Sequence, residues 1–255
     1  RVIQTMQSEL FRIRKSRLFF GCLVLAAFFV FALALTFYHN SVNAMLSAIS
    51  LVPFTEFLFS DYSLIFPLTL FLCLYFTEDF HTGSYSMALS KGANRAQVFF
   101  GKLLAAWISV FFFLLVCFVV AYLSILMMGT ARYDIEYSLP AMGTFLLIQC
   151  LCFLGYTAVL NLISYLLRHR IIVTIVAFFV LGVLYLYLTK ISAALDMDYS
   201  LYKYWIVGLS HSLRINTIAE DFMPILITLA VYLFLPTVMS FFLFQKLDLR
   251  SLERR

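Results

Sequence analysis

The chain has 255 residues, of which 64% are hydrophobic and only 12% are charged. Soluble domains carry about 25% charged residues, so this composition excludes an ordinary soluble domain and indicates a membrane protein. Because one membrane-spanning helix takes about 20 apolar residues, about six spans would leave no room for a soluble catalytic domain. The net charge of +5 is small and scattered along the chain, which argues against a nucleic acid as the partner.

Residues 1–17 form the first predicted element, an amphipathic helix on the inner face of the membrane. Val2, Met6, Leu10 and Ile13 are spaced four, four and three residues apart, which places them on one helical face. Basic residues close the segment, as is typical of interfacial helices. The alternative interpretation is a plain basic anchor that flanks the first span.

Charge-free stretches locate the membrane spans, because a charge at the bilayer centre costs roughly 2.5 to 3.5 kcal/mol. We predict an all-α, polytopic membrane protein in which the whole chain, 1–255, is a single transmembrane domain with both termini in the cytoplasm. The six predicted spans lie at about residues 18–38, 57–77, 103–128, 142–167, 171–189 and 222–245. This topology places 14 of the 18 Lys and Arg residues inside and four outside, in agreement with the positive-inside rule. Residues 39–56 become an external or re-entrant segment, and residues 190–221 an external connection.

Two local features shape the predicted helices. The fourth and fifth spans are joined only by Arg168, His169 and Arg170, which predicts a tight antiparallel hairpin on the cytoplasmic side. Pro67 and Pro236 lie within the second and sixth spans, where each removes a backbone hydrogen bond and is expected to kink its helix.

The cytoplasmic connection at residues 78–102 differs from the rest of the chain, because charged residues and glycines bracket a short apolar segment. Residues 84–90 can form a two-turn helix that presents Tyr85 and Met87, and Gly92 can end it as a left-handed cap. A short helix with a few apolar anchors and a charged rim suits a small, transient contact with a soluble partner. We therefore expect this loop to dock into a groove of another protein.

At this loop the chain resembles the permease subunits of ATP-binding-cassette exporters of the type-2 class, the small six-span bacterial kind. In that family an acidic residue follows the second span, and Gly with Thr or Ser opens a short helix. The helix ends in Ser or Lys with Gly, and a basic residue and a Gly-Lys pair lead into the third span. The matching positions in this chain are Glu78 or Asp79, Gly83-Ser84, Ser90-Lys91-Gly92, Arg95 and Gly101-Lys102. Residues 8–15 are similar to the family's N-terminal connecting helix.

The resemblance implies a transport subunit, not an enzyme, that is a multi-pass protein of the bacterial cytoplasmic membrane. It implies pairing with a second copy or a paralogue and with two separate ATPase subunits, which would hold ATP and Mg²⁺. No cofactor is expected in this chain, which has no Gly-x-x-x-x-Gly-Lys-Ser/Thr phosphate loop. The residues expected to couple the chain to the ATPase are Glu78, Asp79, Gly83, Ser84, Tyr85, Met87, Leu89, Ser90, Gly92 and Arg95. Glu78, Asp79 and Arg95 would fix the approach through polar contacts, with both acids outside the apolar core.

Polar side chains within the predicted spans are functional candidates, because they are costly in hydrocarbon. Gln149 and Asn161 lie twelve residues apart in the fourth span and project in similar directions. Hydrogen bonding between helices is the favoured interpretation, and contact with a substrate is the alternative. Cys150 and Cys152 point to opposite sides of a helix and the four histidines lie on different connections, so no metal site is expected.

The sequence therefore predicts a permease half that exports an apolar or amphipathic substrate, such as a peptide, a drug or a lipid. An ATP-independent channel or carrier is a second hypothesis, but it predicts charges within the spans, and the centres of the predicted spans hold none. A polytopic membrane enzyme is a third hypothesis, and the chain has no Ser, His and acid cluster or His-Glu-x-x-His motif that would support it.

Overall fold

The structure of the chain, a computed structural model, describes residues 2–43, 49–60, 64–90, 92–128, 131–132, 139–194, 201–216, 218 and 221–246. Helices make up most of it, because a helix satisfies its own backbone hydrogen bonds when apolar side chains surround it. Strands within the described residues are limited to one short parallel pair, β1 (Ile49–Ser50) and β2 (Ala131–Arg132), with Ile49 opposite Ala131. Apart from this pair, the predicted all-α class is confirmed.

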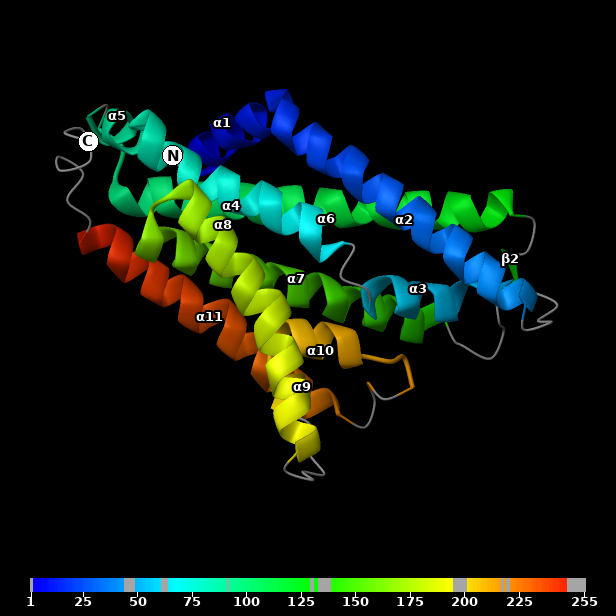
Figure 1. The fold of residues 1–255 in the computed structure, drawn as a ribbon. Coiled ribbons are helices and arrows are strands. Elements are labelled where there is room, and N and C mark those ends of the chain that lie inside the picture. The colour runs from blue at the N-terminus through cyan, green and yellow to red at the C-terminus, as the bar shows by residue number, and fades with distance from the viewer. Residues whose placement is uncertain are drawn as a thin grey trace.

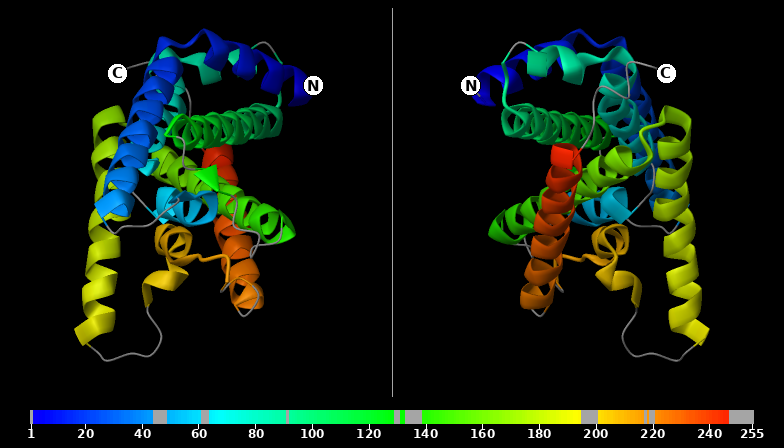
Figure 2. Two further views of the ribbon diagram at one scale, coloured as in Figure 1. Left: turned by 90° about the vertical axis from the view of Figure 1, so that its right-hand side faces the viewer. Right: turned by 90° about the vertical axis from the view of Figure 1, so that its left-hand side faces the viewer.

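The chain runs back and forth between two ends of a helical bundle. In order, the helices are α1 (Val2–Lys15), α2 (Arg17–Asn43), α3 (Leu51–Ser60), α4 (Ile65–Thr82), α5 (Ser84–Ser90), α6 (Arg95–Met127), α7 (Leu139–Leu167), α8 (Arg170–Phe178), the π-helical η1 (Phe179–Val183), α9 (Leu184–Ala194), the 3-10 helix η2 (Leu201–Tyr204), α10 (Ile206–Ser212) and α11 (Phe222–Lys246). Figure 1 shows α1, α5 and the C-terminal end of α11 at one end, which we call the α5 end. Figure 2 shows α1 lying across that end.

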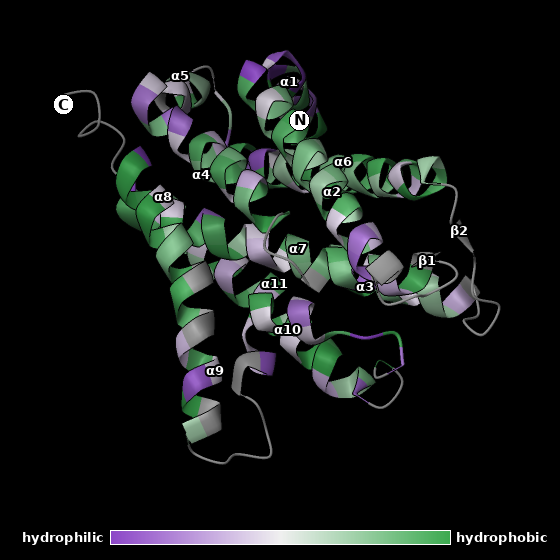
Figure 3. Cartoon of the chain, turned by 45° about the vertical axis from the view of Figure 1, so that its right-hand side comes forward, coloured by the Kyte–Doolittle hydropathy of each residue, from purple (hydrophilic) through white to green (hydrophobic). Residues whose placement is uncertain are grey.

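Four helices are long and apolar enough to cross a membrane. Within the described residues these are Arg17–Asn40, Arg95–Met127, Pro140–Leu167 and Phe222–Lys246. They contain the first, fourth and sixth predicted spans and almost all of the third. Hydrophobic residues dominate these helices (Figure 3). Such a set of helices is typical of a multi-pass membrane protein.

The second predicted span, 57–77, is divided between two helices. α3 ends at Ser60 and α4 begins at Ile65, and residues 61–63 lie outside the described part of the chain. Pro67 therefore lies in the first turn of α4, where backbone N–H groups have no partner within the helix. The predicted kink at Pro67 is wrong for this reason, whereas Pro236 does lie inside α11.

The structure has the tight turn that the sequence predicts between the fourth and fifth predicted spans. α7 ends at Leu167 and α8 begins at Arg170, and Arg168 between them has a left-handed backbone with φ of 57°. This conformation lets the chain reverse within two residues. The helical run then continues without a break through η1 and α9 to Ala194, and it contains the fifth predicted span.

Two clusters of buried apolar side chains hold the helices together. The larger one extends along the bundle and includes side chains of α2, α4, α6, α7 and α10. The smaller one lies beneath α5 and contains five rings that we call the aromatic cluster: Phe80, Tyr85, Phe99, Tyr165 and Phe244. Within the predicted external connection 190–221, α10 packs against α7 and α11 and buries Ile206 and Val207.

Candidate functional site

The α5 end contains a buried group of charges centred on Asp79, near the C-terminal end of α4. Asp79 Oδ1 lies 2.6 Å from Arg12 Nη1 of α1, and Asp79 Oδ2 lies 2.5 Å from Lys102 Nζ of α6. The Asp79 and Lys102 side chains are only 3% and 2% exposed. Burial of a charge is tolerated only when it is paired, so this carboxylate ties three helices together.

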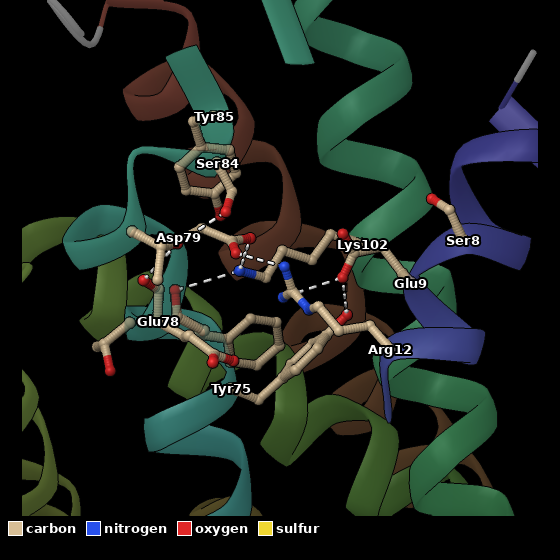
Figure 4. Close-up of polar contacts among 12 residues, drawn as sticks. Ser8, Glu9, Arg12, Tyr75, Glu78, Asp79, Ser84, Tyr85 and Lys102 are labelled. Carbon is tan, nitrogen blue, oxygen red and sulfur yellow. Dashed lines mark hydrogen bonds and ion pairs between the residues drawn. The ribbon is translucent and has the colours of Figure 1, made fainter. Parts of the chain in front are cut away.

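The pairing continues within α1 to Glu9. Arg12 Nη2 lies 3.1 Å from Glu9 Oε2, and the Tyr75 hydroxyl donates a 3.0 Å hydrogen bond to the same oxygen (Figure 4). We call Glu9, Arg12, Asp79 and Lys102 the charge cluster. Its two acids and two bases balance, so the cluster has no net formal charge, and its central pair, Asp79 and Lys102, is shielded from water.

Aromatic rings enclose the lysine of the charge cluster. Lys102 Nζ lies 5.0 Å from the centre of the Tyr75 ring and 4.9 Å from the centre of the Tyr85 ring. It also donates a 3.4 Å hydrogen bond to the Phe76 carbonyl. Ring faces attract cations, so these contacts compensate part of the desolvation of the ammonium group.

Electrostatics keep the acid and the arginine of this group ionised. Burial by itself raises the pKa of Asp79, but the Lys102 ammonium and the Arg12 guanidinium outweigh it and hold that pKa below its ordinary value. Burial lowers the pKa of Arg12, and the attraction to Asp79 more than reverses this, so the net pKa is raised. Asp79 and Arg12 therefore stay charged at neutral pH.

Gly101 explains how α1 comes close enough to join the charge cluster. A Cβ at this position would lie 2.9 Å from Cβ and Cγ2 of Thr5 and 3.3 Å from the Met6 backbone nitrogen. Only a glycine allows α1 to pack this closely on α6. The next residue, Lys102, then meets the same carboxylate as Arg12, so the Gly-Lys pair has a structural role in this chain.

The short helix α5 covers the charge cluster and inserts the Tyr85 side chain into the bundle. Gly83 ends α4 in a left-handed conformation, with φ of 66°, and turns the chain into α5. Tyr85 is 2% exposed, and its hydroxyl lies 3.1 Å from the Tyr165 hydroxyl of α7. Its ring centre lies 5.2 Å from those of Phe80 and Phe244, so α5 contacts α4, α7 and α11 through one residue.

The predicted limits of this helix are confirmed. α5 spans Ser84–Ser90, and Gly92 follows in a left-handed conformation with φ of 84°. Its outer surface carries Met87, which is 58% exposed, and Ser90, which is also exposed. α5 therefore has an inner side fixed by Tyr85 and an outer side that faces away from the protein.

The structure separates the predicted coupling residues into two groups. Those with exposed or half-buried positions are Glu78, Gly83, Ser84, Met87, Leu89, Ser90, Gly92 and Arg95. Asp79 and Tyr85 are buried, so neither reaches the surface to contact an ATPase directly. The prediction that Asp79 lies outside the apolar core is wrong, because cations from two other helices draw it inward.

The connection between α4 and α6 is shorter than the predicted loop. Glu78 and Asp79 belong to the last turns of α4, and α6 begins at Arg95, so the connection between these helices covers 83–94 rather than 78–102. Arg95 Nη1 donates hydrogen bonds to the carbonyls of Phe244, at 3.3 Å, and Gln245. These carbonyls end α11 and have no partner within that helix, so Arg95 caps α11.

The two amides of the fourth predicted span are both buried within α7. Gln149 Nε2 donates a 3.0 Å hydrogen bond to the Ser210 carbonyl, and the Ser210 hydroxyl donates a 2.7 Å bond to Gln149 Oε1. Hydrogen bonding between helices is therefore confirmed for Gln149. Asn161 is 2% exposed, and its Nδ2 makes no hydrogen bond with any residue in the described part of the chain.

Sequence reasoning missed the partners of Asp79 and Tyr85. Lys102 was noted only as part of a motif, although a lysine inside an apolar run already signals a buried partner. Arg12 is one of the basic residues that close the predicted amphipathic helix, and nothing local in the sequence indicates a contact with α4. Comparison of the chain with protein-family models and with curated proteins gives no match. Among the described residues, no group of three His, Cys, Asp or Glu side chains could hold a metal ion.

Proposed function

We propose that this chain is the permease subunit of a type-2 ATP-binding-cassette exporter in the bacterial cytoplasmic membrane. It would pair with a second copy or a paralogue and with two ATPase subunits, which bind ATP and Mg²⁺. The observation that carries the proposal is α5, a short helix with an exposed outer side and a buried anchor, Tyr85, that contacts several helices of the bundle. This is the arrangement that a coupling element needs.

Six membrane spans and a cytoplasmic α5 end are part of the proposal. Helices α2, α4, α6, α7, the run α8–α9 and α11 lead alternately away from the α5 end and back to it. The four apolar helices among them support membrane insertion directly, and the remaining two complete the alternation. Most Lys and Arg residues then lie on the α5 side, which favours the cytoplasm.

The proposed mechanism starts when ATP binding closes the two ATPase subunits and displaces α5. Tyr85 transmits this displacement, because its ring touches α4 and α11 and its hydroxyl contacts α7. The Tyr85 ring also contacts Lys102 of α6, which is paired with Asp79. The displacement would therefore extend to α6 and, through Asp79, to α1. The bundle would then change conformation, and the substrate would contribute through its different affinity for the two states.

This mechanism assigns the coupling residues different tasks. Met87, Ser90 and Glu78 lie at the surface and would contact the ATPase, whereas Tyr85 and Asp79 act within the permease as positioning residues. The substrate would be apolar or amphipathic, because the spans offer it little beyond apolar side chains. Gln149 is hydrogen-bonded to Ser210, whereas Asn161 Nδ2 makes no hydrogen bond within the described residues and could donate to a substrate.

Photo-crosslinking from single positions tests the docking of α5. A photoreactive amino acid at Met87 should capture a protein that contains a phosphate-binding loop. The matched control is Met127, another exposed methionine, at the end of α6 away from α5 and 85% exposed. Met127 should capture no ATPase, and capture from Met127 alone would refute the assignment of α5.

An activity measurement separates the exporter from a passive channel or carrier. In the purified complex, Met87→Glu should weaken substrate-stimulated ATP hydrolysis, because a charge replaces an apolar anchor of the contact, while Met127→Glu should leave it unchanged. Substrate movement through vesicles that contain the chain without any ATPase or ATP would contradict the proposal and favour the channel hypothesis.

A further inference from the structure

A cavity of about 180 Å³ opens at the α5 end beside the charge cluster. Its walls come from α1, the turn to α2, α4 and α8, and they include Arg12, Ser16, Leu18, Phe71, Glu78 and Arg170. At about 30 Å³ for each water in the liquid, this is room for roughly six water molecules. The cavity can therefore hold a small polar group but not an extended chain.

Charges of both signs face this cavity. Arg170 has a buried Nε that makes no hydrogen bond with any residue in the described part of the chain. It is the first residue of α8, where the helix N-terminus adds positive partial charge. Glu78 is exposed, and Figure 4 shows its carboxylate turned away from Lys102. A ligand with one anionic and one cationic group matches these walls.

The cavity also borders surfaces that would face lipid. Leu18 and Phe71 form its apolar side and lie in helices assigned to the membrane. On α8, one and five residues after Arg170, the side chains of Ile171 and Ile175 are 64% and 62% exposed. A ligand bound here can place apolar tails along α8 while its polar group occupies the cavity.

We propose that the cavity binds the headgroup of phosphatidylethanolamine, with the phosphate at Arg170 and the ammonium group at Glu78. The phosphate accepts hydrogen bonds from a guanidinium in favourable geometry, and the primary ammonium can donate to the carboxylate. A trimethylated headgroup has no such donor, and phosphatidylglycerol has no cation. The inference rests on the proposed placement of the α5 end at the inner face of the membrane.

Native mass spectrometry of the purified full chain tests this assignment. One lipid at a time is added to the detergent micelles: dioleoyl phosphatidylethanolamine, dioleoyl phosphatidylcholine or dioleoyl phosphatidylglycerol. The chain is then released from the micelles in the spectrometer, and the fraction that retains the lipid is measured. Arg170→Gln should lower retention of phosphatidylethanolamine roughly tenfold, the loss expected for a hydrogen bond to a charged group. Glu78→Gln should remove the preference for phosphatidylethanolamine over phosphatidylglycerol while phosphate binding persists.

Arg168→Gln is the matched control, because Arg168 lies two residues from Arg170, is exposed and donates a hydrogen bond to the Tyr165 carbonyl at the end of α7. It should retain the lipid as the unmodified chain does. Equal loss from Arg168→Gln and Arg170→Gln, or equal retention of the three lipids, would overturn the proposal. Arg170→Lys keeps the positive charge and should keep the preference for phosphatidylethanolamine over phosphatidylglycerol. Loss of that preference would also count against the proposal.

A further arm distinguishes a lipid from a soluble phosphate. Soluble phosphoethanolamine at the concentration of the lipid should not displace it, because it has no apolar tails to bury. Displacement would assign the cavity to a soluble ligand and overturn the lipid assignment. The assay contains no ATPase, so its failure would leave the docking of α5 standing, and a failed crosslink from Met87 would leave the lipid site standing.

Discussion

Removing the charge of Asp79 should destabilise the protein more than any other single change in the charge cluster. In Asp79→Asn the Lys102 ammonium, 2% exposed, loses the carboxylate and keeps neutral partners, which include the Phe76 carbonyl at 3.4 Å and the rings of Tyr75, Phe76 and Tyr85. Breaking a buried ion pair in this way costs about 3–5 kcal/mol. The expected result is a loss of that size in the free energy of unfolding.

The reverse change should be milder, because Asp79 has two cationic partners. In Lys102→Met the carboxylate keeps Arg12 at 2.6 Å, so the expected loss is about 1–3 kcal/mol, that of one hydrogen bond to a charged group with its desolvation cost. Combining Lys102→Met with Asp79→Asn leaves no buried charge unpaired, since Arg12 retains Glu9 at 3.1 Å. The double variant should therefore be more stable than Asp79→Asn alone.

Unfolding of the purified protein in detergent micelles, followed by circular dichroism, measures all three variants. In micelles without phosphatidylethanolamine, Glu78→Gln is the control, because Glu78 is next in the chain to Asp79 but exposed, and its effect should stay within about 0.5 kcal/mol. The reasoning fails if the double variant is less stable than Asp79→Asn, or if the effects of the two changes simply add.

The pH dependence of unfolding tests the same carboxylate independently. The pKa of Asp79 is lower in the folded protein than in the unfolded chain, so its contribution is present at neutral pH and is lost as pH falls through the folded pKa. Lys102 is the strongest of the groups that lower this pKa. Lys102→Met should raise it toward the pKa of the unfolded chain, so the acid-induced loss of stability that Asp79 contributes should be smaller than in the unmodified protein.

Two further pairs of variants use the same unfolding assay. Gly101→Ala should lower stability by about 1–3 kcal/mol, because its Cβ would overlap α1, whereas Gly143→Ala in α7 meets no atom within 4 Å and should raise stability by up to about 1 kcal/mol. Equal effects at both glycines would refute the close packing of α1 on α6. Gln149→Leu should cost about 1–3 kcal/mol, because it leaves buried groups of Ser210 without partners, while Asn161→Leu should change stability little. A large loss from Asn161→Leu would show that this amide has a partner the fold does not reveal.

Features that depend on neighbours in the sequence were predictable. The limits of α5 follow from Gly83 and Gly92, whose left-handed conformations stop helices on either side of it. The α7–α8 hairpin follows from the three-residue gap between two apolar runs. In both cases the signal lies within a few residues of the feature, so no knowledge of the fold is needed.

Contacts between distant segments were not predictable in the same way. Arg12 and Asp79 are 67 residues apart, and no periodic pattern relates an arginine of α1 to the end of α4. The orientation of α5 was ambiguous for another reason. Apolar residues occupy positions 85, 87, 88 and 89, so they surround most of a two-turn helix and do not decide whether Tyr85 or Met87 points inward. The surrounding rings decide it, since only the assembled bundle forms the aromatic cluster.

Stability alone does not account for the buried charges, because an apolar pair of similar volume is often as stabilising as a buried ion pair. Their geometry gives them another property. Asp79 can satisfy both cations only while α1, α4 and α6 hold one relative position, whereas apolar side chains tolerate sliding. Tyr85 lies directly on Lys102, 4.9 Å from ring centre to Nζ, so a displacement of α5 acts on this pair first. A small displacement is resisted, since separating Lys102 from Asp79 costs several kcal/mol, and a large one carries α1 and α6 along. Under the proposed function, this all-or-none response is what an ATP-driven cycle between two states requires.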